Sequence, residues 1–122
     1  MKILICDDDP MTIRALEFQL KKDGYEVIKS VNGREATKIL DSDTGIDLLI
    51  VDIHMPMMSG FELVTYVRDN LKRSIPVIVL SKVNSQDSIT EALDLGANAY
   101  FTKPFNLEEL SNKIKEVFLN IN

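Results

Sequence analysis

Residues 3–8 have the sequence Ile-Leu-Ile-Cys-Asp-Asp, in which four apolar side chains are followed directly by two carboxylates. A short, unbroken apolar run is typical of a strand that is buried on both faces of a parallel sheet. Residues 48–52, Leu-Leu-Ile-Val-Asp, repeat this pattern and again end in an acid. The carboxyl ends of strands in an open α/β sheet border the ligand crevice. The two stretches therefore predict that Asp7, Asp8 and Asp52 meet at one edge of a parallel sheet.

Five apolar strands alternate with five helical patterns along the whole chain. We expect the strands at about residues 2–6, 26–30, 47–51, 76–80 and 98–102. Helix-starting signals follow them at Asp9-Pro10, at Asn32, near Ser85 and at Asn106, and a loop from Asp52 to Gly60 leads into the remaining helix. In that helix we expect Phe61, Val64, Val67 and Leu71 to face inward. Strands that alternate with helices predict a doubly wound parallel sheet with helices on both faces.

Strand polarity predicts the order of the sheet. The runs near residues 2–6, 47–51 and 76–80 are the most continuously apolar and belong in the middle, whereas the other two carry polar residues and suit the edges. Right-handed crossovers then give the order 2-1-3-4-5, which is the flavodoxin-like arrangement. In this order the first and third strands are adjacent, so their terminal acids face one another.

The bulk properties restrict the partners of the chain. Its 122 residues fit one domain, and the net charge of −5 argues against direct binding to nucleic acid. The single cysteine, Cys6, lies inside an apolar run and is predicted to be a buried structural thiol. No stretch has the length of a membrane span, and the amino terminus lacks the apolar region of a signal peptide. We expect a cytoplasmic protein that does not bind a membrane.

A hydroxyl and an ammonium group follow two further strands. Ser81 comes after the run at 76–80, and Lys103 follows the run at 98–102. Clustered carboxylates repel one another, so the site must bind a cation or protonate one member. Mg²⁺ prefers oxygen ligands, and one such ion together with Lys103 would balance the charge of three carboxylates. These groups predict a metal-assisted phosphoryl site.

The position of each acid suggests its role. Asp52 stands alone at the head of a loop and is the best nucleophile candidate. Asp8 and Asp52 are placed to coordinate the metal directly, with Asp7 acting through a water molecule. The simpler interpretation is that such acids end strands and cap helices. We accept it for Asp9, which precedes Pro10, but not for the other three together, because Ser81 and Lys103 reach the same edge.

The set of residues, in this order and spacing, resembles the receiver domains of two-component response regulators. The likeness covers essentially the whole chain. It rests on Asp7-Asp8, the loop Asp52 to Gly60, Ser81, Tyr100 and Lys103-Pro104-Phe105.

The resemblance implies a role for each matching position. Asp52 matches the phosphoacceptor, which takes a phosphoryl group from a phosphohistidine of a sensor histidine kinase or a histidine phosphotransfer protein. Asp7, Asp8 and the main-chain carbonyl of His54 match the protein ligands of Mg²⁺, together with Asp52. Lys103 matches the lysine that contacts the phosphoryl oxygens.

The resemblance also implies a conformational switch. Ser81 matches the hydroxyl that moves toward the new phosphate, and Tyr100 matches the aromatic residue that turns inward behind it. The change would reach the surface formed by the helix near 85–95, strand 98–102 and the last helix, where a downstream effector protein or an output domain binds. The peptide bond before the proline matching Pro104 is typically cis in this family.

One position departs from the family pattern. The residue after the switch hydroxyl is normally small, but here it is Lys82. Its ammonium group could favour the phosphoryl group, or its bulk could obstruct small phosphodonors. We hypothesise that Lys82, Val83 and His54 form a crowded rim that slows loss of the phosphate.

Three functions are compatible with these residues to different degrees. The first is a phosphorylation-controlled signalling switch that is no enzyme beyond its own phosphorylation and dephosphorylation. The second is a pseudo-receiver that no longer accepts phosphate and acts as a protein-binding module. The unusual Lys82 is the reason to retain this alternative. The third, a small flavodoxin-like or phosphohydrolase enzyme, lacks a glycine-rich phosphate loop after the first strand and a second nucleophile or base near Asp52.

We expect residues 1–122 to form one receiver domain, either as a single-domain regulator or as part of a larger protein. Receivers that dimerise often carry acids at the start of the fifth strand. Here that stretch is Ala97-Asn98-Ala99, which favours a monomer and leaves phosphorylation-dependent dimerisation open.

Overall fold

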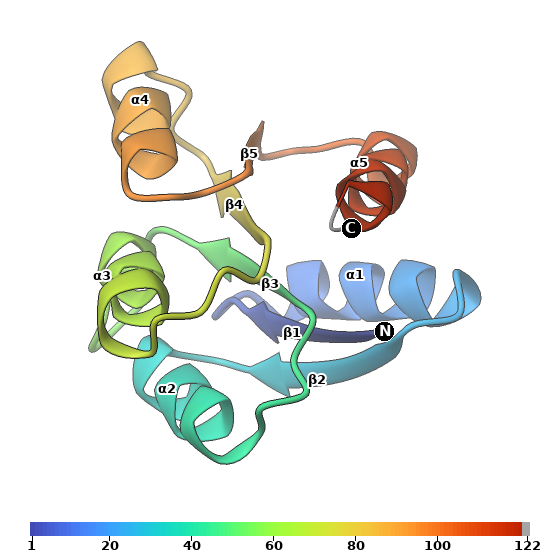
Figure 1. Ribbon diagram of the computed structural model, residues 1–122. Coiled ribbons are helices and arrows are strands. Elements are labelled where there is room, and N and C mark those ends of the chain that lie inside the picture. The colour runs from blue at the N-terminus through green and yellow to red at the C-terminus, as the bar shows by residue number, and fades with distance from the viewer. Residues whose placement is uncertain (121–122) are drawn as a thin grey trace.

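A computed structural model describes residues 1–120. The last two residues of the predicted domain, 121 and 122, lie outside the described part. The strands are β1 (Lys2–Cys6), β2 (Glu26–Ser30), β3 (Leu48–Asp52), β4 (Val77–Ser81) and β5 (Ala99–Thr102). They form one parallel sheet in the order β2-β1-β3-β4-β5, which confirms the predicted order (Figure 1). Because β1 and β3 are neighbours, the acids that follow them lie next to each other at the carboxyl edge.

Helices cover both faces of the sheet. They are α1 (Pro10–Lys22), α2 (Gly33–Ser42), α3 (Gly60–Thr65) with a π-helical turn η1 (Tyr66–Asn70), α4 (Gln86–Asp94) and α5 (Leu107–Leu119). Figure 1 shows α1 and α5 on one side of the sheet and α2, α3 and α4 on the other. This is the doubly wound arrangement expected from alternating strands and helices.

Side-chain alternation in the strands builds two apolar cores. Ile3 and Ile5 pack with α1 and α5, whereas Leu4 and Cys6 pack with α2 and α3 on the other face. All residues of β3 and β4 are buried, while β2 at the edge is mostly half-buried or exposed. The apolar runs were therefore a correct guide to the centre of the sheet.

The single thiol is sealed in the core beside a thioether. Cys6 has no exposed surface, and its Sγ donates to Sδ of Met55 at 3.2 Å. Burial raises the pKa of this thiol to about 12, so it stays protonated. The prediction of a buried structural thiol is confirmed.

Side chains cap the helices where the sequence indicated. Asp9, Asn32, Ser85 and Asn106 accept hydrogen bonds from main-chain N–H groups in the first turns of α1, α2, α4 and α5. Proline at the first position of α1 fits this pattern. Within residues 1–120, no helix is both long and apolar enough to cross a membrane.

The third helix differs from the prediction of a regular helix through Leu71. After α3 the chain widens into η1, where the N–H of Leu71 donates to the carbonyl of Tyr66, five residues back. Val64 and Val67 are fully buried, but Phe61 and Leu71 are only half-buried. Arg68, inside this turn, donates to the carbonyls of residues 73, 75 and 96. These tertiary hydrogen bonds favour the π-helical turn over a regular helix. The spacing of apolar residues along the sequence does not reveal them.

Met57 lies in a disfavoured backbone conformation. Its φ is +73°, and its side chain is 73% exposed, so no packing depends on it. Asparagine tolerates the left-handed region better than methionine does. We expect Met57→Asn to raise the free energy of unfolding by about 0.5–1 kcal/mol, measured by urea denaturation. The control is Met11→Asn, which changes an exposed methionine inside α1. We expect it not to raise the free energy of unfolding. A Met57→Asn protein no more stable than wild type would contradict the argument.

Candidate functional site

Three acids meet at the carboxyl edge of the sheet. Asp52 is the last residue of β3, and Asp7 and Asp8 follow β1, whose Cys6 pairs with Val51. Carboxylate oxygens of the three residues all lie within 4.8 Å of one another. Asp7 and Asp52 are buried, whereas Asp8 is exposed. The structure thus brings together the acids that the sequence placed at one edge, with Asp8 on the open side.

Lys103 points into the acid cluster. It follows β5, and its main-chain N–H donates to the carbonyl of Ser81 at 2.7 Å. Its Nζ lies 2.8 Å from Oδ2 of Asp7 and 3.5 Å from Oδ2 of Asp52, and the side chain is only 10% exposed. The Lys103–Pro104 bond is cis, as the resemblance implied.

The electrostatics of the cluster follow from this geometry. Burial raises the pKa of Asp52, and the charge of Asp7 raises it further, while Lys103 partly opposes both effects. Burial alone would lower the pKa of Lys103, but its hydrogen bond to Asp7 and the charges of Asp7 and Asp52 more than offset this, so its pKa is raised. Lys103 is therefore a permanent cation, and the cluster keeps a net negative charge that a metal ion can neutralise.

The Asp52 pKa gives a prediction on stability and pH. In the metal-free protein the folded state holds the Asp52 proton at pH values where the unfolded chain has lost it, so stability declines as pH rises above the ordinary pKa of 3.8. Asp52→Asn cannot ionise. We expect it to be more stable than wild type at about pH 7, and by a smaller margin at about pH 4. Urea denaturation in a chelator measures both differences, and an equal difference at the two pH values would refute the mechanism.

Val83 connects the other two predicted residues. The buried Ser81 accepts a hydrogen bond at its Oγ from the N–H of Val83 at 3.0 Å. Tyr100 donates its hydroxyl to the carbonyl of Val83. The ring of Tyr100 is half-buried against the core on the α2–α4 side. Ser81 thus binds the main-chain N–H of Val83, and Tyr100 binds its main-chain carbonyl, in the β4–α4 loop.

Gly60 allows the loop after Asp52 to fold back on the strand. Its N–H donates to the carbonyl of Ile53 at 2.8 Å. A Cβ at this position would lie 2.5 Å from the carbonyl oxygen of Asp52 and 2.7 Å from Cα of Ile53. Only glycine fits this approach, which fixes the main chain next to Asp52.

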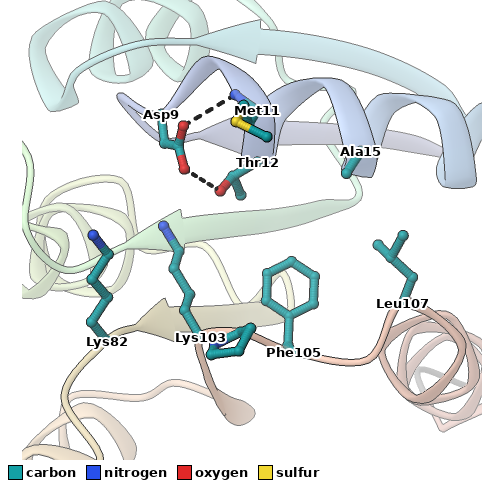
Figure 2. A pocket seen from close by; sticks show the side chains of 9 residues that line it. Asp9, Met11, Thr12, Ala15, Lys82, Lys103, Phe105 and Leu107 are labelled. Atoms are coloured by element: carbon teal, nitrogen blue, oxygen red, sulfur yellow. Dashed lines mark hydrogen bonds between the residues drawn. The ribbon is translucent and has the colours of Figure 1, made fainter.

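Two adjoining hollows open at this edge. A cleft of about 240 Å³ is lined by Asp8, Asp9, Asp52, His54, Lys82 and Lys103. A larger, mostly apolar groove of about 560 Å³ runs between α1 and the start of α5, and shares Asp9, Lys82 and Lys103 with the cleft (Figure 2). Asp9 caps α1 as predicted, but its place on the cleft wall was missed, because cap chemistry alone explained it.

His54 and Asp8 complete the cleft wall at its exposed side. The His54 side chain is exposed, and its main-chain N–H contributes a hydrogen bond that lowers the pKa of Asp52. The role of the His54 carbonyl as a ligand remains a prediction. The oxygen-only donor set of Asp7, Asp8 and Asp52, with one acid open to solvent, suits a hard divalent cation.

Comparisons with known proteins identify the family of this chain. A family model described as the response regulator receiver domain matches residues 3–115. Chemotaxis protein CheY1 of Helicobacter pylori is 37% identical over 124 residues, covering 100% of this chain and 99% of the relative. Response regulator RR06 of Streptococcus pneumoniae is 37% identical over 115 residues, covering 94% of this chain and 52% of the relative. A crystal structure of a two-component response regulator from Clostridium difficile superposes with a TM-score of 0.94 at 30% identity, over 100% of this chain and 98% of that one.

The chain therefore belongs to the response regulator receiver domains of two-component signalling. It spans about half the length of several curated relatives, RR06 among them, and nearly the whole of CheY1.

Proposed function

We propose that this receiver accepts a phosphoryl group from a phosphohistidine partner onto Asp52 in a reaction that depends on Mg²⁺. The observation that carries the proposal is the position of Lys103 Nζ, 3.5 Å from Asp52 within a cluster of three acids. A carboxylate beside a fixed ammonium group and a cation site is what phosphoryl transfer requires, because that reaction depends on positioning and on neutralising oxygen charge.

The metal site is assigned to four groups. Asp8 and Asp52 would hold Mg²⁺ directly, with the main-chain carbonyl of His54. Asp7 would act through water, since its Oδ1 already accepts from the N–H of Asp9 at 2.9 Å and its Oδ2 from Lys103 at 2.8 Å. When bound, Mg²⁺ supplies positive charge for the phosphoryl oxygens.

The chemical step needs no further nucleophile. A carboxylate oxygen of Asp52 forms a bond to phosphorus while the bond from phosphorus to the imidazole nitrogen breaks, and the imidazole leaves with the electron pair. Lys103 binds a phosphoryl oxygen in the position where it now contacts Asp52. Reaction of the acyl phosphate with water later restores the carboxylate, so the domain catalyses only its own phosphorylation and dephosphorylation.

The signal passes through the β4–α4 loop. The new phosphoryl oxygens attract the Ser81 hydroxyl, which now accepts from the N–H of Val83. Since Tyr100 binds the carbonyl of the same residue, moving Val83 also changes how the Tyr100 ring packs against the core on the α4 side. The affected surface consists of α4, β5 and α5, where a downstream effector protein or an output domain would bind.

We further propose residues 1–122 as one receiver domain that works in the cytoplasm. Its partners are a sensor histidine kinase or a histidine phosphotransfer protein, and it is a monomer that can dimerise on phosphorylation. The non-phosphorylated alternative receives no support from the site, because the acids and Lys103 are all in place.

The test is a mass measurement after incubation with Mg²⁺ and a small acyl phosphate, followed by incubation with a phosphorylated sensor kinase. We expect one phosphoryl adduct on wild type with at least one of the two donors. Asp52→Asn should abolish it, and Asp69→Asn, an exposed acid in η1, should not. Absence of an adduct with both donors, or an adduct that survives Asp52→Asn, would overturn the proposal.

A further inference from the structure

Lys82 is a second ammonium group at the acid cluster. It follows Ser81 directly, and its side chain lines both the cleft and the apolar groove beside it. Figure 2 shows the Lys82 and Lys103 side chains extended in the same direction, toward the start of α1 where Asp9 lies. The ammonium group of Lys103 forms an ion pair with Asp7. Lys82 forms no ion pair or side-chain hydrogen bond with any residue in the described part of the chain.

The charge of the site shows what Lys82 changes. Four carboxylates, those of Asp7, Asp8, Asp9 and Asp52, lie in or beside the cleft together with two ammonium groups. The formal charge of the cleft is therefore −2 with Lys82 and −3 without it. Adding a phosphoryl group to Asp52 makes the site more negative by about one unit. A lysine at the mouth of the cleft thus opposes a cation and favours an added anion.

We infer that Lys82 is a phosphoryl-binding residue of this site, whose ammonium group stabilises the anion-bearing state of Asp52 and weakens Mg²⁺ binding to the free site. The inference rests on the proposed function and adds a cation that the main phosphoryl contact, Lys103, does not provide. Lys82 is exposed, so its charge is partly screened, and its effects are moderate and depend on salt.

Two affinities separate this role from a structural one, because they shift in opposite directions. We expect Lys82→Met, which keeps most of the apolar stem and removes the ammonium group, to bind Mg²⁺ about three- to tenfold more tightly than wild type. The same variant should bind beryllofluoride, an anionic phosphoryl mimic, about two- to fivefold more weakly at saturating Mg²⁺. Lys82→Arg retains the charge and should leave both affinities near those of wild type.

Titration calorimetry with Mg²⁺ alone, and then with beryllofluoride at saturating Mg²⁺, measures both effects. Lys22→Met removes the same charge from the far end of α1, about 18 Å along the helix from Pro10, and should change neither affinity. Raising the ionic strength from about 0.05 M to about 0.5 M should shrink the shifts of Lys82→Met.

The outcomes distinguish the inference from the function on which it rests. If wild type binds both probes and Asp52→Asn loses beryllofluoride, the proposed function holds. Lys82→Met affinities that equal those of wild type, or that shift in the same direction, then overturn the role of Lys82 alone. If wild type binds neither probe, both proposals fail.

Discussion

Lys103→Met is expected to destabilise the metal-free protein by about 2–4 kcal/mol, because it leaves buried carboxylates without their counter-charge. The side chains of Lys103 and Asp7 are 10% and 1% exposed, so water cannot replace the lost partner. Methionine preserves the apolar stem, so the loss reports charge rather than packing. Phosphorylation of Asp52 should slow by about a hundredfold or more, the effect of removing one well-placed group that binds the developing charge.

Chemical denaturation in a chelator and in Mg²⁺ tests the electrostatic origin of this effect. Mg²⁺ should stabilise Lys103→Met more than wild type, since the variant has lost a cation that competes with the metal ion. Adding Asp7→Asn to the variant should restore part of the lost stability, because it removes the stranded charge. Destabilisation that neither Mg²⁺ nor Asp7→Asn relieves would show that Lys103 acts through packing instead.

Gly60→Ala is the second large effect, and we expect a loss of about 2–3 kcal/mol. The added Cβ would meet the carbonyl oxygen of Asp52 at 2.5 Å and Cα of Ile53 at 2.7 Å, both of which belong to the main chain. Neither atom can move aside as a flexible side chain would. The end of β3 must shift, so the rate of Asp52 phosphorylation should fall together with the unfolding free energy.

Gly45→Ala is the matched control. At that exposed glycine the nearest atoms are Oδ1 of Asp43 at 3.2 Å and Nζ of Lys2 at 3.7 Å, which are the ends of flexible side chains. We expect a change of less than about 1 kcal/mol and an unchanged phosphorylation rate. Equal losses at the two glycines would show that the close approach at Gly60 is not the cause.

The sheet and its acidic edge could be predicted because both follow from local patterns. Apolar runs buried on both faces mark β1, β3 and β4, and a parallel sheet places the ends of such runs together. The acids that end two of these runs therefore had to meet. Strand boundaries were off by one residue in β3, β4 and β5, because the bordering residues fit either state.

The features that could not be predicted from the sequence depend on tertiary contacts between distant residues. The widened turn η1 contains Arg68, which binds the carbonyl of Gly96, and no helical period records that contact. The convergence of Ser81 and Tyr100 on Val83 depends on how the β4–α4 loop folds back over β5. The inward direction of Lys103 was indicated by the resemblance, since a lone lysine after a strand is more commonly solvated.

Because Cys6 is buried, alkylation of its thiol can report local opening of the native protein. A thiol with no accessible surface and a pKa of about 12 is inert to alkylating reagents while the sheet is intact. Any alkylation must therefore pass through an opening that separates β1 from the helices on the Cys6 side. Labelling kinetics, with no probe introduced by mutation, would then give the free energy of that opening, and comparison with and without phosphodonor would show whether the signal loosens or tightens the centre of the domain.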